Sequence, residues 1–428
     1  MNYTRPGGIA LIAWLAAMPA FSAGTLSWED CRKAALEHDP DYLSAKSTAG
    51  AAKASYGGSI AGLLPSVGLG GSLNDRQNQA MNARWSSSLS VNMDILNFSD
   101  WMSIRRSAAS LDAARASLRQ ASAQARRSVR TAFASLLYAQ ELVRSSEEIT
   151  AIRDRNAKLV TLRYEAGREL PGDKLQVEAQ LMEATASLSQ ARRNLMTARM
   201  ALARYIGVKA SSEGPVVAGD LAIAVPPSSP PDTEILVDGL PVVQAARARV
   251  KQARASLYET RGRLLPALSA SYSRGRSGPT DIMDGPFSWQ DRTSLSWGAG
   301  ASLSWPILSS GVISLPFAWT VASRQAAQAS ESARSTELSA AQDLQSAWSS
   351  YSAAADLTAV QDAYLKAADQ RNREAEIRYT SGRISFDGWE RMVNEYIDYK
   401  RSALRTRRDA VTAEAAWYQV LGRGLEEP

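Results

Sequence analysis

The chain has 428 residues but only one cysteine, Cys31, and one histidine, His38. One cysteine excludes an intramolecular disulfide and a zinc site built on several thiolates, and one histidine argues against a metal site built on several imidazoles. The single histidine argues equally against a Ser-His-Asp catalytic triad built around a second histidine. The Ser-x-x-Lys, Gly-x-Ser-x-Gly and P-loop patterns do not occur in a supporting context. We therefore expect no enzyme activity, no metal site and no cofactor.

Long apolar runs are also missing, apart from one at the start of the chain. That run, Ile9–Ala17, follows Arg5 and precedes Pro19 and an Ala-Phe-Ser-Ala sequence (Ala20–Ala23), a pattern typical of a secretory signal peptide. The alternative interpretation is a buried N-terminal helix. No later run reaches about 18 apolar residues, so we expect no membrane-spanning α-helix. The sequence predicts that residues 1–23 direct export and are then removed.

Charge of one sign does not dominate, because 43 acidic residues are interspersed with 49 basic ones and the formal net charge is +6. This balance is weak support for any particular partner. Basic clusters such as Arg126, Arg127 and Arg130 lie on predicted helices among acidic residues, which is typical of a solvated helical face. We expect no nucleic-acid partner.

Four landmarks occur twice, in the same order, in the two halves of the chain. Two pairs lie 201 residues apart: Pro40 with Pro241, and Pro65 with Pro266. Two further pairs lie 215 residues apart: Arg163–Gly167 with Arg378–Gly382, and Tyr205–Gly207 with Val420–Gly422. Such a series indicates an internal duplication. We expect a first repeat at residues 24–210 and a second at 237–428, joined by a Pro-, Gly- and Ser-rich linker at 211–236.

Each repeat is predicted to contain a helix, two strands, a very long helix and a further helix. The first helix stops at a Leu-Leu-Pro sequence, because proline cannot continue it. The strands are predicted at about Ser66–Leu73, Trp85–Ile95, Ala267–Ser273 and Thr293–Trp305. The long helices, at about residues 99–166 and 311–381, would each extend roughly 100 Å if unbroken.

The strands have one mostly apolar and one polar face, because side chains alternate along a strand. Strands of about 11–13 residues are long enough to cross a bilayer, with the apolar face toward lipid and the polar face toward water. The lipid-facing candidates are Trp85, Leu89, Val91, Leu295, Trp297, Leu303 and Trp305. Without spanning helices a closed barrel is the remaining way to cross, and four strands are too few to close a wide one. We therefore expect a barrel shared between chains; the alternative is a soluble sheet of two hairpins packed on helices.

These features resemble the TolC-like outer-membrane factor family over essentially the whole mature chain. The motifs that carry the resemblance are "GLLPS" (Gly62–Ser66) and "RLLPA" (Arg263–Ala267), "DILNFSDW" (Asp94–Trp101) and "WPILSSG" (Trp305–Gly311), and the two "RYxxG" turns. The resemblance implies a mainly α fold with a β-barrel portion: duplicated long α-hairpins forming a periplasmic α-barrel, and four transmembrane β-strands per protomer in a trimeric twelve-stranded barrel.

The same resemblance implies an outer-membrane exit duct of a Gram-negative bacterium, serving a tripartite efflux pump or a type I secretion system. Its partners would be two further copies of the chain, outer-membrane lipid, a periplasmic adaptor (membrane fusion protein) and an inner-membrane RND or ABC transporter. The duct would be passive and gated at its periplasmic end. The alternative is a periplasmic or surface coiled-coil scaffold without a channel.

The resemblance also suggests gate residues. An acid commonly follows the first turn glycine of this family by six residues, which here is Asp173, and the aromatic of the second turn is Tyr379. We hypothesise that the two belong to one inter-helix network that holds the entrance shut. The alternative for Asp173 is that it caps the helix that follows Pro171.

The second turn departs from the family pattern. The constricting acids of the family fall at positions that are Gly388 and Arg391 here, while Asp387 and Glu390 lie one residue earlier. In a trimer this pair would form a ring of six carboxylates around the pore that favours cations. The alternative is that both side chains face outward, because a shift of one residue turns a helix position by about 100° around the axis. The arginine that the family places two residues after the glycine is shifted as well, to Arg383.

The two turns would form the helix tips that contact the adaptor. The candidate residues are Arg163, Gly167, Arg168, Arg378, Gly382 and Arg383. The alternative is that they are ordinary turn residues, with the glycines present for their backbone conformation.

Overall fold

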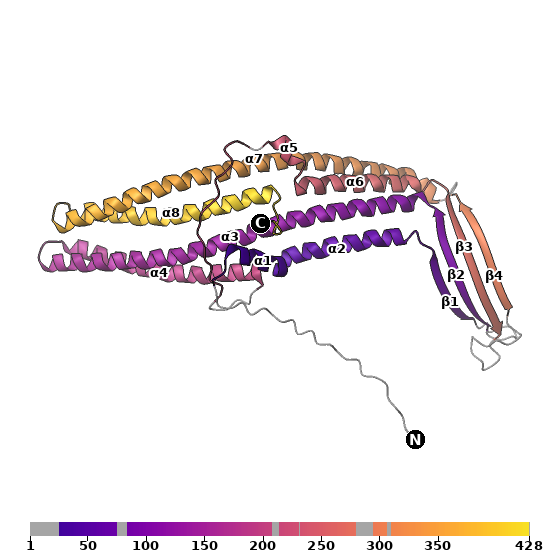
Figure 1. Ribbon diagram of the computed structural model, residues 1–428, viewed down its shortest axis with the longest axis horizontal. Helices are drawn as coiled ribbons and strands as arrows, with labels where there is room; N and C mark the ends of the chain where they lie inside the picture. The colour runs from indigo at the N-terminus through magenta and orange to yellow at the C-terminus, as the bar shows by residue number, and fades with distance from the viewer. Residues whose placement is uncertain are drawn as a thin grey trace, which may run out of the picture.

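The computed structural model describes residues 25–74, 84–207, 214–230, 232–279, 294–305 and 310–427. The chain forms long helices with one four-stranded sheet at one end (Figure 1). In chain order the elements are α1 (Trp28–His38), α2 (Pro40–Ala61), β1 (Ser66–Asn74), β2 (Arg84–Leu96), α3 (Phe98–Glu165), α4 (Pro171–Ile206), α5 (Thr233–Val237), α6 (Pro241–Gly262), β3 (Ala267–Pro279), β4 (Ser294–Ser304), α7 (Ser310–Thr380) and α8 (Phe386–Val420). The expected signal peptide lies outside the described residues.

The long helices lie side by side in a row that changes two of its members halfway along (Figure 1). Next to the sheet the order is α2, α3, α6 and α7, and in the other half it is α4, α3, α8 and α7. α3 and α7 run through both halves because they have 68 and 71 residues. Of the helices that the structure describes, none combines the length and apolar character needed to cross a membrane.

Local sequence sets where the helices begin. Asp39 caps α2, because its Oδ1 accepts hydrogen bonds from the backbone N–H groups of Asp41 and Tyr42, both at 2.9 Å. Pro40 then occupies the first helical position, where no backbone N–H is needed. Asn97 caps α3 in the same way.

Glycines in the left-handed conformation set where four of the long helices end. They have φ angles of 70–78° and are Gly167, Gly207, Gly382 and Gly422. L-residues with a Cβ rarely adopt this conformation. At Gly207 a Cβ would also lie 2.4 Å from the Cβ of His38, so the contact with α1 requires glycine as well. The single histidine of the chain is therefore in contact with a helix end.

The four strands form an antiparallel meander in chain order, so that β2 of the first repeat pairs with β3 of the second. One face carries serine and glycine, and its hydroxyls bond across strands: Ser72 to Ser86 at 2.8 Å, for example. Ser269 and Ser302 form the same pair at 2.8 Å on the other hairpin. The opposite face is mainly apolar, and its exposure in the single chain is largest on the edge strands, with Leu69 of β1 87 % exposed. Within the described residues, β1 and β4 each have one edge without a partner strand.

The third strand is longer than the sequence predicts. It continues to Pro279, whereas the prediction ends it at Ser273. An Arg-Gly-Arg sequence interrupts the apolar alternation at that point, yet Arg274 stays in register beside Trp297 of β4. Two arginines thus lie on the mainly apolar face of the sheet. The predicted first residue of the fourth strand, Thr293, lies outside the described residues.

The seven strand residues expected to face lipid do not all lie at the surface of the chain. Four on or just after β4 are 60–71 % exposed: Leu295, Trp297, Leu303 and Trp305. Leu89 and Val91 on β2 are half-buried. Trp85 is only 5 % exposed in the single chain, and its contact with lipid stays a prediction. Trp85 lies in register between Leu73 of β1 and Gly278 of β3.

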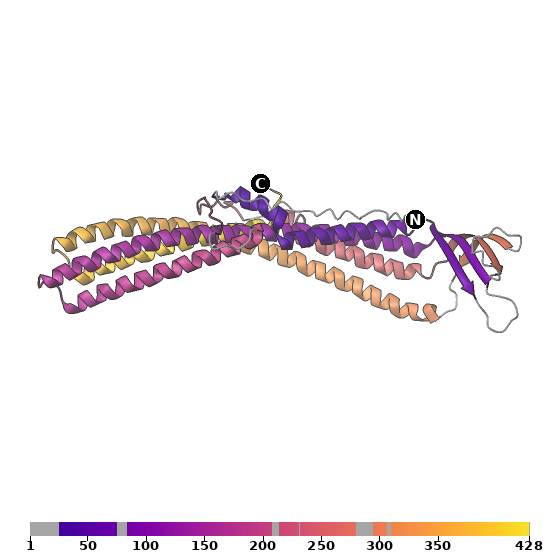
Figure 2. The same cartoon turned by 90° about the horizontal axis from the view of Figure 1, so that it is seen from below.

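A second layer, made of α1 and the last described residues, covers one side of the helix row near its middle (Figure 2). Leu425 is fully buried there. Two arginines fix the backbone of this C-terminal segment: Arg32 Nη1 donates to the carbonyl of Leu425 at 2.6 Å, and Arg126 Nη1 donates to the carbonyl of Gly424 at 3.0 Å. The C-terminal end of the second repeat is thereby attached to helices of the first.

Candidate functional site

The two helical hairpins end in matching turns, at the end of the molecule far from the sheet (Figure 1). Gly167 joins α3 to α4 and Gly382 joins α7 to α8, with φ angles of 70° and 73°. In both turns the N–H of the arginine after the glycine bonds the carbonyl five residues back at 2.8 Å. A Cβ on either glycine would meet nothing within 4 Å, so the backbone conformation alone accounts for the glycine.

A shared carboxylate joins the two turns. Arg163 Nε lies 2.9 Å from Oε1 of Glu169, and its Nη1 donates to the backbone carbonyl of Tyr379 at 3.0 Å. The hydroxyl of Tyr379 donates to the same oxygen of Glu169 at 2.9 Å. Arg163 and Glu169 belong to the first hairpin and Tyr379 to the second, so this cluster fixes one hairpin against the other.

Aromatic packing surrounds that cluster. Tyr379 is 1 % exposed and stacks on Trp389 of α8, with ring centroids 4.3 Å apart and planes within 3°. Phe386 packs edge-on against Trp389 at 6.2 Å. Burial, and then the hydrogen bond to Glu169, raises the pKa of the Tyr379 phenol, so it remains a protonated donor. The second turn is therefore held by packing and by a directed hydrogen bond.

A second polar cluster lies deeper between the hairpins, around Glu390 of α8, which is 9 % exposed. Gln176 and Gln180 of α4 donate to its two carboxylate oxygens, the first at 2.5 Å. Arg153 of α3 donates to Gln180 at 2.9 Å and to Asn394 of α8. Burial lowers the pKa of Arg153, and the nearby charge of Glu390 opposes that effect. Three helices from the two hairpins thus meet in one buried network.

The expected gate residues separate into buried and exposed groups. Asp173 does not bond Tyr379; its Oδ2 accepts from the backbone N–H of Leu170 at 3.4 Å, which is the capping alternative. Asp387 is exposed and Glu390 is buried, so the two acids do not share one exposed face. Arg383 is exposed at the second turn.

The residues expected to contact an adaptor all lie at the two turns. Arg168, Arg383 and both glycines are exposed, and Arg378 is exposed beside Glu374 at 3.6 Å. Arg163 differs, because its guanidinium lies over the ring of Tyr379 at 4.5 Å within the buried cluster.

Sequence reasoning missed the residues that hold the hairpins together. They are Arg153, Glu169, Gln176, Gln180 and Trp389. Only Glu169 carried a local signal, since it lies two residues after the turn glycine. Among the residues that the structure describes, no group of three or more His, Cys, Asp or Glu is placed to hold a metal ion.

Comparison with known proteins gives one family and several solved structures. The chain matches the family described as Outer membrane efflux protein over residues 32–208 and 238–423. It is similar to the outer-membrane channel OprN, with 20 % identity, a TM-score of 0.78, and coverage of 93 % of this chain and 90 % of that one. VceC of Vibrio cholerae gives 18 % identity, a TM-score of 0.78 and coverage of 93 % and 97 %. The open state of MtrE of Neisseria gonorrhoeae gives 19 % identity, a TM-score of 0.79 and coverage of 93 % and 89 %. No curated protein sequence matched the chain.

Proposed function

Because the chain belongs to the outer membrane efflux protein family, we propose that it forms the outer-membrane channel of a tripartite efflux pump. Three copies make a passive exit duct in the outer membrane of a Gram-negative bacterium. The alternative within the same architecture is the exit duct of a type I secretion system. An RND or ABC transporter in the inner membrane supplies the energy, and a periplasmic adaptor bridges the two.

The sheet is the observation that carries this proposal. It has a serine and glycine face, an exposed apolar face and two open edges. Open edges are not stable in a membrane, because every backbone N–H and C=O there needs a partner. Pairing β4 of one copy with β1 of the next closes a twelve-stranded barrel from three copies, with hydroxyls toward water and apolar side chains toward lipid.

The edges of the helix row support the same assembly. Large apolar side chains are exposed on α4 at one edge of the row and on α7 at the other. On α4 they are Leu175, Met182, Met196 and Met200, and on α7 they include Phe317, Val321, Leu338, Leu357 and Val360. Apolar surface along both edges favours burial against a neighbouring copy. Three rows joined edge to edge would form a tube of twelve helices.

The second layer fixes which side of the row faces outward. α1 and the C-terminal segment lie on one side only (Figure 2). If the tube closed with this layer on its inner side, the layer would block the channel. In the proposed assembly the layer therefore surrounds the outside of the tube, and the opposite side lines the duct.

The hairpin contacts supply a gate at the periplasmic end. The clusters around Glu169 and Glu390 hold α7–α8 against α3–α4. In the proposal these contacts keep the entrance narrow, and their separation opens it. Asp387 and Arg383 are exposed nearby and are available to a pore or to an adaptor.

Conductance in a planar bilayer tests the channel itself. We expect the purified protein to insert and give stepwise ion currents that need no nucleotide, because the proposed barrel is water-filled. Protein whose circular dichroism shows folded helices but which gives no current at any voltage would contradict the channel and favour the scaffold alternative.

Charge reversal at the tips tests the adaptor contact. We expect Arg168→Glu with Arg383→Glu to lower resistance to an exported toxic compound roughly fivefold. Reversing charges at the rim of the contact should slow the association of the channel with the adaptor. The amount of trimer should not change, since both side chains are exposed. Arg155→Glu with Arg405→Glu, at exposed sites away from the tips, is the matched control. Normal export in the tip variant would refute an adaptor role.

A further inference from the structure

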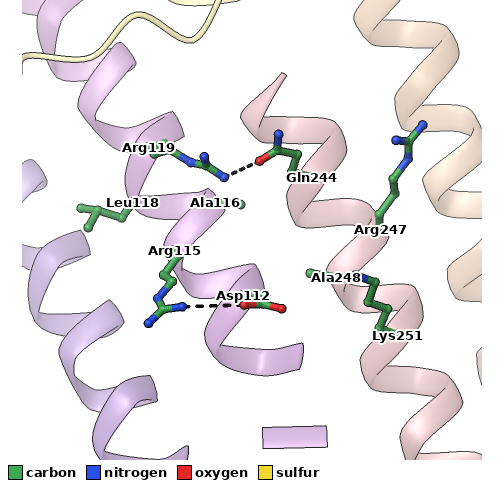
Figure 3. A pocket seen from close by; sticks show the side chains of 9 residues that line it. All are labelled: Asp112, Arg115, Ala116, Leu118, Arg119, Gln244, Arg247, Ala248 and Lys251. Atoms are coloured by element: carbon green, nitrogen blue, oxygen red, sulfur yellow. Dashed lines mark hydrogen bonds and ion pairs between the residues drawn. The ribbon is translucent and has the colours of Figure 1, made fainter. Parts of the chain in front are cut away.

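A long groove runs between α3 and α6 in the half of the row next to the sheet, and Figure 3 shows the larger of its two hollows. It consists of two adjoining hollows of about 620 Å³ and 350 Å³, which share Asp112 and Lys251. Along α3 its lining extends from Met102 to Arg119, which is about 26 Å of helix. We name it the α3/α6 groove.

Positive charge dominates the α3/α6 groove. Its basic lining residues are Arg105, Arg115, Arg119, Arg247, Lys251 and Arg254, and its single lining carboxylate is Asp112. Arg247 is already paired with two carboxylates, at 2.6 Å and 2.8 Å. Arg115 lies 3.9 Å from Asp112. Lys251 and Arg254 have no acidic partner within 4.0 Å among the described residues, so the groove has an excess of positive charge.

The floor of the groove is made of alanine. Ala109 and Ala116 on α3 face Ala248 and Ala255 on α6, each pair seven residues apart, and all four are buried. Small side chains let two helices approach closely and leave a shallow apolar trough above the contact. The long basic side chains stand at the rim of this trough, as Figure 3 shows for Arg115 and Lys251.

The groove opens on the side of the row that carries the second layer. Arg105, Asp112 and Arg119 precede Arg126 by whole multiples of seven residues, and Arg126 holds the C-terminal segment. Residues seven apart stay on one helix face, with a drift of only about 20° per step. Taking this side as the outside of the tube is the one step that rests on the proposed function.

We propose that the α3/α6 groove docks an acidic amphipathic helix of a partner protein on the outer surface of the channel. The alanine floor receives the apolar stripe of that helix, and acidic residues flanking the stripe pair with Lys251, Arg254 and the other rim cations. A helix of about 17 residues matches the length of the groove. The site lies between the sheet and the second layer, far from the helix tips.

The shape of the groove favours a helix over other anions. An extended glycan is usually held by several aromatic faces, whereas Tyr258 is the one aromatic among the lining residues that the structure describes. A lipid headgroup needs only a compact cluster of cations at the membrane surface. The rim cations here instead recur over several helical turns beside an apolar trough.

Binding of a designed peptide to the full-length protein in non-ionic detergent tests this proposal. The probe is a fluorescent 18-residue peptide with one Leu/Ala stripe flanked by glutamates. A shuffled peptide of the same composition keeps the charge but loses the stripe. We expect the amphipathic peptide to bind at least tenfold more tightly than the shuffled one, and more weakly as salt is raised. Lys251→Glu with Arg254→Glu should weaken its binding at least tenfold.

Matched controls make the outcomes distinct. Arg155→Glu with Arg405→Glu should leave peptide binding within about twofold of the unaltered protein, because both arginines lie outside the groove. Equal binding of both peptides, or equal loss in both double variants, would overturn the proposal. Groove-dependent binding of polygalacturonate or phosphatidylglycerol vesicles, without binding of the amphipathic peptide, would overturn it in favour of another anion. Light scattering on each variant shows separately whether the trimer forms, so a failed assembly is not mistaken for a failed site.

Discussion

Glu390→Ala should raise the time that the channel spends open in a bilayer at least tenfold. The carboxylate accepts hydrogen bonds from Gln176 and Gln180 across the two hairpins, and Arg153 is buried beside it. Hydrogen bonds to a charged group contribute about 1.5–3 kcal/mol each, and 1.4 kcal/mol corresponds to a tenfold change in an equilibrium. The contact occurs three times in a trimer. Single-channel recording of the purified variant measures the effect.

Asp387→Ala is the matched control, because Asp387 lies one turn away on the same helix but is exposed. If Glu390 joins the hairpins, as its contacts indicate, the control should leave the open time unchanged. If the two acids instead ring the pore, each substitution should reduce cation selectivity. A loss of selectivity in both variants, without a change in open time, would refute the role of Glu390 in closing the entrance.

Ala299→Arg should prevent most of the protein from assembling in the outer membrane. Ala299 lies near the middle of β4 on the apolar face of the sheet, in register with Tyr272. Arginine at the lipid-facing middle of a transmembrane barrel costs about 2–4 kcal/mol, and three copies would share the proposed barrel. We expect the amount of trimer in the outer-membrane fraction to fall more than tenfold, measured by immunoblot against total protein.

Gly300→Arg is the control for that prediction. Gly300 is the next residue of β4 and lies on the serine and glycine face, where the nearest atom to a new Cβ would be Ser271 Oγ at 4.0 Å. The arginine would then project into water, so trimer yield should stay within about twofold while the conductance changes. Equal yields from Ala299→Arg and Gly300→Arg would show that the apolar face does not contact lipid.

Local sequence rules placed most elements, because proline stops and strand alternation need no long-range information. A strand expected at 85–95 is present at Arg84–Leu96, and one expected to end at Ser273 continues to Pro279. That error arose where Arg-Gly-Arg broke the alternation. The strand pattern alone does not tell how far each side chain is exposed in the folded chain: Trp85 is buried and Trp297 is exposed, although both lie on the apolar face.

The candidate site was harder to predict than the fold. Positions three apart on a helix differ by about 60° around its axis, which is enough to put Glu390 inside and Asp387 outside. The two glutamines that bond Glu390 come from α4, more than 200 positions earlier in the chain, and no local pattern marks them. The turns themselves were recognisable, since their glycines and arginines repeat in both halves.

The mass of the protein extracted from the outer-membrane fraction, measured by light scattering and corrected for bound detergent, tests the shared barrel most directly. We predict about three times the mass of one chain, because the open edges of the sheet and the apolar edges of the helix row are then all paired. A monomer recovered in soluble form from the periplasm would contradict the channel, and the two-faced strands would then belong to a sheet within a single chain.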